Sequence, residues 1–375
     1  MVVTGVGSIS NVGFNHKMSS ANYYAGITRR GPLDFVFFDY ENSEVAPVLG
    51  HAVSLNKGFQ GNGRISRMAA HALLDLIQNY GDALYSSKNL HLILVTGDDY
   101  YQVQNVKNID GLDQSVLNEI IESINFENAQ YAKELESTIG SNLNDFVDKE
   151  LVFDSTKVVR GGECKLAEVF KDINEVLVSN PDLTFLVLAS DTLVQPIQLE
   201  TMADLSLINH VEEKGGFFPG EASVCFLIES ESSAIDCGKE IISSLNGIEY
   251  IKSDAHRFSD FYIQDNGLFQ CADRTMENIT GTQQEKLFVN LNGDSLRAKK
   301  LSNSFIKLIN NKKVDPNIEL LTPATTFGDC YSVNSAISIS LVIHGFLRGI
   351  IKQNAVSIWL LSDNGDCASL NVVKY

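Results

Sequence analysis

Short apolar segments of strand length alternate with amphipathic helical segments along nearly all of the 375 residues, and this alternation limits the possible folds most strongly. The strand-like segments of the first part stand at 2–7, 90–97, 184–190 and 222–230. Between them, apolar residues recur at helical spacing, most clearly at 64–77. This order predicts an α/β fold in which mixed sheets are covered by helices.

The second part of the chain repeats the same style of alternation. It contains a predicted pair of strands at 241–251, strands at 286–293 and 318–323, a long helix at 332–348 and a terminal hairpin. A chain of this length exceeds what one simple core usually holds. We therefore predict two structurally duplicated halves, residues 1–235 and 236–375, although no sequence repeat links them.

The charge balance argues against nucleic acid as a partner. Lys and Arg number 29 against 47 Asp and Glu, which gives a formal net charge of −18, and no cluster of basic residues offsets it. The N-terminus lacks the basic and apolar segments of a secretion signal. The longest apolar stretch, near 337–347, is too short to span a bilayer. We expect a cytoplasmic protein with no membrane span.

Neither a metal nor a nucleotide cofactor is expected. The six cysteines show no CxxC spacing, so neither a zinc site nor a disulfide framework is indicated. The first predicted strand, 2–7, is expected to run into a glycine-rich turn, but Gly5, Gly7 and Gly13 lack the spacing of a dinucleotide-binding loop. Another polar group, Asp98 to Tyr101, follows a predicted strand, and we interpret it as a solvated loop.

Several segments, taken in order, resemble the β-ketoacyl synthases, which are condensing enzymes of the thiolase fold. They are VVTGVGSISNVG at the start, GGFFPGEASVCFLIES from Gly215, FVNLNGDS from Phe288, LLTPATTFGDC from Leu320 and SIWLLSDNGDC from Ser357. The resemblance covers nearly the whole chain. It implies a thiolase-like α/β fold of two pseudo-duplicated halves, layered α-β-α-β-α, and a protein that forms dimers.

Cys164 stands where the synthases carry their nucleophile, at the first turn of a predicted helix over 164–178. A helix N-terminus lowers the pKa of a thiol and so favours the reactive thiolate. The small residues that flank the family's cysteine are replaced here by Glu163, Lys165 and Leu166. Two interpretations stay open: a positioned, accessible thiol, or a buried cysteine at the start of a helix.

The resemblance places the two catalytic histidines of the family at Asn292 and Asp329, and its lysine at Ala324. Asparagine does not exchange protons near neutral pH, and a carboxylate repels the negative charge that develops during condensation. The C-terminal loop, at 363–367, lacks the Gly-Phe-Gly-Gly run of the family. The sequence therefore predicts the loss of most condensing machinery, and it leaves open whether the chain is an enzyme.

Two functions follow from this resemblance. In the first, the chain is a non-condensing subunit similar to the chain-length factors of polyketide and aryl-polyene systems. It would pair with an active ketosynthase, as a homo- or heterodimer, and work with an acyl carrier protein in fatty acid or polyketide-type synthesis. In the alternative, it is a stand-alone acyltransferase or thioesterase-like enzyme with Cys164 as its nucleophile.

Overall fold

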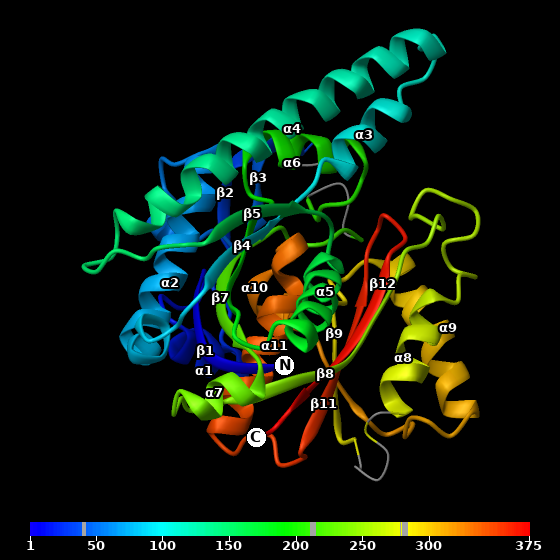
Figure 1. Ribbon diagram of the computed structural model, residues 1–375. Helices are drawn as coiled ribbons and strands as arrows, with labels where there is room; N and C mark the ends of the chain where they lie inside the picture. The colour runs from blue at the N-terminus through cyan, green and yellow to red at the C-terminus, as the bar shows by residue number, and fades with distance from the viewer. Residues whose placement is uncertain (40–42, 211–214, 278, 280–283) are drawn as a thin grey trace.

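Ten strands form one mixed sheet in the computed structural model, which describes residues 1–39, 43–210, 215–277, 279 and 284–375 (Figure 1). Their order across the sheet is β10-β9-β11-β12-β8-β1-β7-β6-β4-β5. Neighbouring strands run parallel at both ends of the sheet and antiparallel in its middle. The predicted α/β class with mixed strand directions is confirmed.

The predicted strands and helices appear in the predicted order, and the structure adds others that were not predicted, among them the strands Gly31–Asp39, Glu44–Gly50 and Ser155–Arg160. The first half contains β1 Val2–Ser10, α1 His16–Tyr24, β2 Gly31–Asp39, β3 Glu44–Gly50, η1 Ser54–Asn56, α2 Gly61–Tyr85, β4 Leu90–Thr96, α3 Tyr100–Lys107, α4 Gln114–Asn144, β5 Ser155–Arg160, α5 Lys165–Ser179, β6 Thr184–Thr192, α6 Pro196–Asp204, β7 Glu221–Glu229 and α7 Glu231–Asp236. The second half contains β8 Ser243–Ile251, α8 Gly267–Glu277, β9 Lys286–Val289, α9 Ser295–Asn310, β10 Glu319–Leu321, α10 Ala324–Phe327, η2 Tyr331–Val333, α11 Asn334–Leu347, β11 Ala355–Leu361 and β12 Cys367–Val373.

The two halves share one strand topology. In the first half, β1 pairs antiparallel with β7, β7 antiparallel with β6, and β4 parallel with both β6 and β5. In the second half, β8, β12, β11, β9 and β10 repeat this sequence of neighbours and directions. The predicted duplication is therefore present in the topology. The division at residues 235 and 236, which falls in α7, stays a prediction.

Three hydrophobic clusters separate the five layers of the molecule. One packs α2 and α4 on the outer face of the first half of the sheet, and another packs α8 and α9 on the outer face of the second half. The third cluster joins α5 and α11 to the inner faces of both halves, with Phe170, Ile343, Phe226 and Leu360 among its members. Figure 1 shows α5 and α11 between the two halves. The layering is α-β-α-β-α, as expected.

Two local predictions need correction. The first strand does not turn after Gly7 but continues to Ser10. Gly7 serves helix packing instead, since a Cβ there would lie 2.2 Å from the carbonyl oxygen of Ala72 in α2. The second correction concerns residues 241–251, where a pair of strands was expected. The single strand β8 forms there, because β1 and β12 flank it on its two sides.

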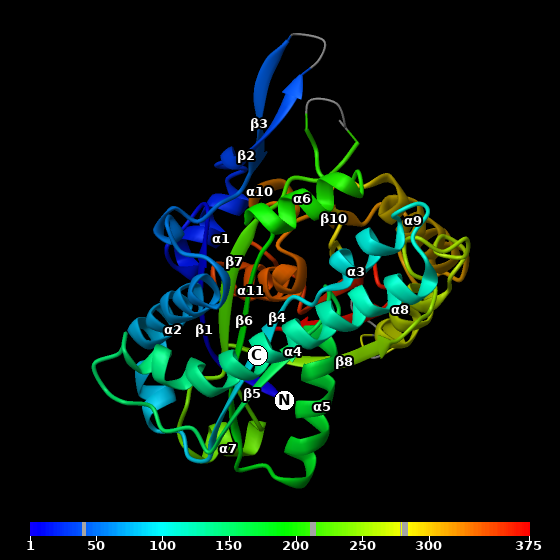
Figure 2. The same ribbon diagram turned by 90° about the horizontal axis from the view of Figure 1, so that it is seen from above.

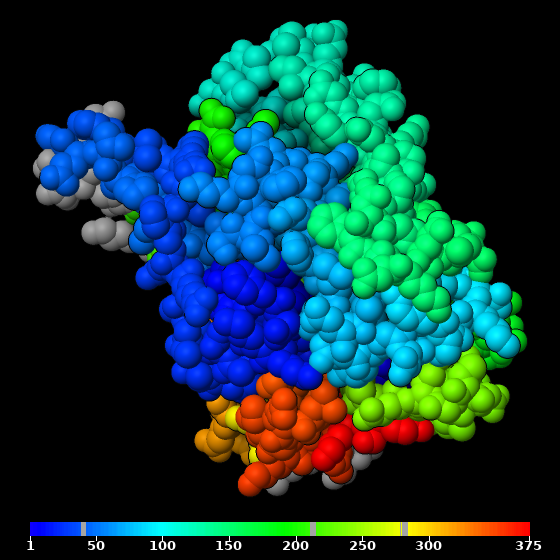
Figure 3. All heavy atoms as spheres, turned by 90° about the vertical axis from the view of Figure 1, so that its left-hand side faces the viewer, coloured from blue at the N-terminus to red at the C-terminus, as the bar shows by residue number. Residues whose placement is uncertain are grey.

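Two features project from the layered body. The β2–β3 hairpin extends outward, with Phe37 stacked on His210 at 3.9 Å between ring centroids (Figures 2 and 3). The helix α4, which has 31 residues, crosses the first half with only Leu135, Ile139 and Leu143 buried.

Among the described helices, none combines the length and the apolar character that a membrane span requires.

Candidate active site

Cys164 lies at the N-terminal cap of α5, where the sequence places the nucleophile. Only 1% of its surface is exposed, and its thiol donates to the carbonyl oxygen of Asp366 at 3.4 Å. Burial, with added repulsion from Cys367 and Asp366, raises the pKa of this thiol well above its ordinary value. The helix N-terminus does not outweigh desolvation here. Of the two interpretations that the sequence left open, the structure agrees with a buried cysteine at the start of a helix.

Asn292 and Asp329 lie in direct contact, although 37 positions separate them in the sequence. The Asn292 side-chain amide donates to Asp329 Oδ2 at 2.5 Å. The other oxygen, Oδ1, accepts from the Tyr331 backbone amide at 2.9 Å and from Asn334 Nδ2 at 2.7 Å. Asp329 is thus fixed by hydrogen bonds from three residues. Ala324, at the lysine position, begins α10 and brings no donor to the group.

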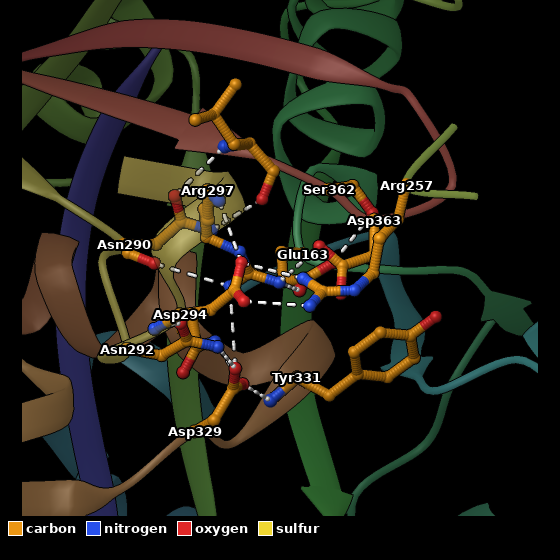
Figure 4. A network of polar contacts seen from close by, with 12 residues as sticks. Glu163, Arg257, Asn290, Asn292, Asp294, Arg297, Asp329, Tyr331, Ser362 and Asp363 are labelled. Carbon is orange, nitrogen blue, oxygen red and sulfur yellow. Dashed lines mark hydrogen bonds and ion pairs between the residues drawn. The ribbon is translucent and has the colours of Figure 1, made fainter. Parts of the chain in front are cut away.

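Arg297 occupies the centre of this group, and the sequence interpretation missed it. Its side chain is fully buried, with 0% exposed. The guanidinium lies 2.5 Å from Glu163 Oε1, 3.0 Å from Asp363 Oδ1 and 3.4 Å from Asp329 Oδ2 (Figure 4). One cation therefore joins the residue before Cys164, the second histidine position and the C-terminal loop. A single arginine in a predicted helix resembles a surface residue, so no local sequence pattern indicated that Arg297 is buried.

The first turn of α9 positions this arginine. Asp294 caps the helix, and its Oδ2 accepts from the Arg297 backbone amide at 2.7 Å. A second arginine, Arg257, holds Asp294 through two bonds of 2.7 and 2.8 Å. Arg257 also lies 3.7 Å from Asp363. The cap, the two guanidinium groups and the loop carboxylate thus form one connected set.

The carboxylates of the set differ in their protonation. Burial raises the pKa of Glu163 to about 7, although Arg297 acts against this rise. Ser362 Oγ donates to its second oxygen, Oε2, at 2.6 Å. Burial also disfavours the charge of Asp363, but Arg297 and Arg257 outweigh it and hold the pKa of Asp363 below its ordinary value. At neutral pH, the carboxyl group of Glu163 is therefore close to its titration point.

This arrangement is suited to holding the structure together rather than to condensation. An oxyanion is stabilised by donors that point into an open pocket. Here the guanidinium of Arg297 and the amide of Asn292 are already engaged by carboxylates. None of the seven histidines takes part in the described contacts of this network. Of the donor atoms of Arg297 and Asn292, Arg297 Nε alone has no hydrogen-bond partner among the described residues, and negative charge developing on a thioester would lie close to the surrounding carboxylates.

No family model matches the sequence, and no curated protein matches it. Solved structures do match over the whole chain. One is a type II polyketide synthase acyl carrier protein in complex with its ketosynthase bound to the hexaketide, at 11% identity and a TM-score of 0.73, covering 98% of that chain. A second is the ishigamide ketosynthase/chain length factor, at 12% identity and 0.67, covering 99%.

A third similar structure is ketosynthase twelve from the bacillaene polyketide synthase of Bacillus amyloliquefaciens, at 11% identity and a TM-score of 0.69, covering 73% of that chain. At such identities the comparison concerns the fold alone. The repeated strand topology and the five layers agree with it. The chain has the thiolase-like fold of polyketide ketosynthases and of their chain-length factors.

Proposed function

We propose that this protein is a non-condensing subunit that pairs with an active ketosynthase, in the manner of a chain-length factor. The observation that carries the proposal is the buried ion-pair cluster of Arg297 with Glu163, Asp329 and Asp363. It fills the place where the resemblance puts the proton-handling groups of a condensing enzyme. A buried charge cluster of this kind resists the opening that a substrate would require.

The thiol supports the same proposal. Cys164 is covered by the loop that leads into β12, through its contact with the Asp366 carbonyl. A thiolate there would be desolvated and would lie near the carboxylates of Glu163 and Asp366. A stand-alone acyltransferase or thioesterase needs the thiolate to form easily in an accessible position. The alternative function is therefore not favoured.

The edge strand β5 offers a surface for a partner. It ends the ten-stranded sheet, so one side of its backbone has no neighbouring strand. The backbone amide of Val158 donates to Glu136 Oε2 at 2.8 Å rather than to another strand. Val152, just before β5, is 76% exposed. We propose that a ketosynthase strand pairs with β5 and displaces the Glu136 contact.

We also propose that this chain forms a heterodimer with the ketosynthase in the cytoplasm, and that the heterodimer works with an acyl carrier protein. A homodimer of this chain would contain two charge-filled sites and no condensing one. The net charge of −18 disfavours an acidic carrier protein as a direct ligand of this chain. The carrier would accordingly dock on the ketosynthase, while this subunit completes the complex.

Intact mass spectrometry tests the proposal. The purified chain is incubated with acetyl and malonyl carrier protein thioesters, alone and together with an active ketosynthase from the same biosynthetic system. We expect an acyl adduct on the ketosynthase only, and no release of carbon dioxide by the chain alone. Cys237, the exposed cysteine, supplies the control, because Cys237→Ala removes non-specific labelling. A persistent adduct that Cys164→Ala abolishes would overturn the proposal.

A further inference from the structure

A cavity of about 620 Å³ lies in the first half, among α2, α3, α4 and α6. Cys164 is not among the residues that line it. Its volume falls in the range of small-molecule sites. Its wall contains the apolar residues Ile65, Ala132 and Leu135 and the carboxylates of Asp98 and Asp191.

The two aspartates are held in place by hydrogen bonds from neutral groups. Tyr331 Oη donates to Asp98 Oδ1 at 2.6 Å, and Ser332 Oγ donates to Asp191 Oδ2 at 2.8 Å. Within the described residues no ion pair reaches either carboxylate. Arg160, the cation in the cavity wall, pairs with Asp99 at 3.4 Å instead. Asp98 and Asp191 therefore line the cavity without an ion-pair partner among the described residues, although the charge of Arg160 acts on Asp98 from beyond ion-pair distance.

The sequence interpretation of this region as a solvated loop is wrong. Burial raises the pKa of Asp98, and it raises the pKa of Asp191 to about 7. Tyr101, two residues beyond Asp99, is buried against Tyr331. A cation brought from outside would relieve the desolvation of both carboxylates.

The cavity wall also has an unused hydrogen-bond acceptor. Gln198 Oε1 is buried and has no hydrogen-bond partner among the described residues. A ligand that donates hydrogen bonds would satisfy it, whereas a plain alkyl chain would leave it unsatisfied. The acceptor and the two carboxylates therefore favour the same kind of ligand, one with N–H groups.

A surface hollow of about 550 Å³ adjoins the cavity. Asp98 and Asp99 line both spaces, and the hollow continues past Lys252, Asp254 and His256. Lys252 and Asp254 are exposed, so the hollow reaches the molecular surface. The shared aspartates mark a route along which an elongated ligand could pass to the interior.

We propose that this cavity binds a chain that ends in a primary ammonium group, with the ammonium between Asp98 and Asp191 and the chain along α4. The carboxylates supply the charge, Gln198 accepts a further N–H, and the apolar residues of α4 contact the methylene groups. The site lies within this chain alone. Its failure would thus leave the proposed pairing with a ketosynthase untouched, and the reverse also holds.

Titration calorimetry on the intact chain tests the proposal with two probes, 6-aminohexanamide and hexanamide, which differ only in the ammonium group. We expect the amine to bind at least about tenfold more tightly, which corresponds to about 1.4 kcal/mol. Asp98→Asn should abolish this preference. Glu122→Gln, an exposed carboxylate elsewhere on α4, is the matched control and should preserve it.

A second pair of variants tests the location. Ala132→Phe fills the cavity and should abolish binding of the amine, whereas Ala129→Phe, on the exposed side of the same helix, should not affect it. Equal binding of the two probes to the unmodified protein would overturn the proposal without any variant. The proposal would also be overturned if folded Asp98→Asn still bound the amine more tightly than hexanamide. Loss of this preference in Glu122→Gln would overturn it too, because it would show a general effect of protein charge.

Discussion

The guanidinium of Arg297 and the carboxylate of Glu163 form an ion pair at 2.5 Å, and neither side chain is exposed to solvent. They lie 134 positions apart, and their ion pair joins α9 of the second half to the residue before Cys164, the N-cap of α5 in the first half. The same arginine reaches Asp329 and Asp363. The buried ion-pair cluster of the candidate site thus also links the two halves of the protein.

Arg297→Met should destabilise the protein by about 3–5 kcal/mol, because it leaves the buried carboxylates of Glu163 and Asp329 without their cation and leaves Asp363 with Arg257 alone. Urea unfolding followed by circular dichroism measures the change. Arg274→Met, which loses a more exposed ion pair with Glu249, is the control and should cost less than about 1 kcal/mol. Adding Glu163→Gln to Arg297→Met should recover part of the lost free energy of unfolding. If the changes in this free energy in the two single variants simply add up in the double variant, the two residues are not coupled.

Glu163 should contribute a fall in the stability of the protein as the pH rises from about 4.5 to about 7. His16, His51 and His344, whose pKa burial lowers to about 4, contribute a rise over part of the same range, so the effect of Glu163 is measured against a matched variant. The folded-state pKa of Glu163 is raised to about 7 from an ordinary 4.5, so the folded state binds its proton more strongly than the unfolded state in this window. Glu163→Gln should flatten this fall, with little difference in slope below pH 4. Parallel stability curves for the two proteins between pH 5 and 7 would contradict the assigned titration.

Thiol reagents should distinguish the cysteines by burial. In the native protein, a disulfide reagent should react promptly with Cys237, the exposed cysteine, and with Cys164 only after denaturant is added. Cys237→Ala should therefore abolish the fast phase, and Cys164→Ala should leave it unchanged. Prompt modification of Cys164, located by peptide mass analysis, would show that the loop over this thiol opens freely.

Val158→Pro should preserve folding but prevent association with a ketosynthase. The Val158 backbone amide bonds to Glu136 rather than to β4, so a proline there removes no bond within the sheet. Thermal unfolding checks the fold, and co-elution on size-exclusion chromatography checks association. Glu136→Ala frees the same amide and should preserve association. Unchanged pairing by Val158→Pro would exclude β5 as the contact strand.

The local sequence was sufficient to predict several helices and strands, because the periodicity of a helix or strand depends on residues close together in the chain. The alternation at 64–77, 90–97 and 184–190 appears in the structure as α2, β4 and β6. The resemblance added the positions of Asn292 and Asp329, and these two residues do lie in contact. What each residue type can do chemically, such as the inability of asparagine to exchange protons, was also available from the sequence.

Only the tertiary structure decided which of these groups are buried and what they face. Arg297 became the centre of the site because Glu163, Asp329 and Asp363 converge on it from three distant segments. Cys164 lost its accessibility to a loop about 200 positions away, and Asp98 became part of a cavity wall. Desolvation and ion pairing depend on such long-range packing, and no local pattern in the sequence records it.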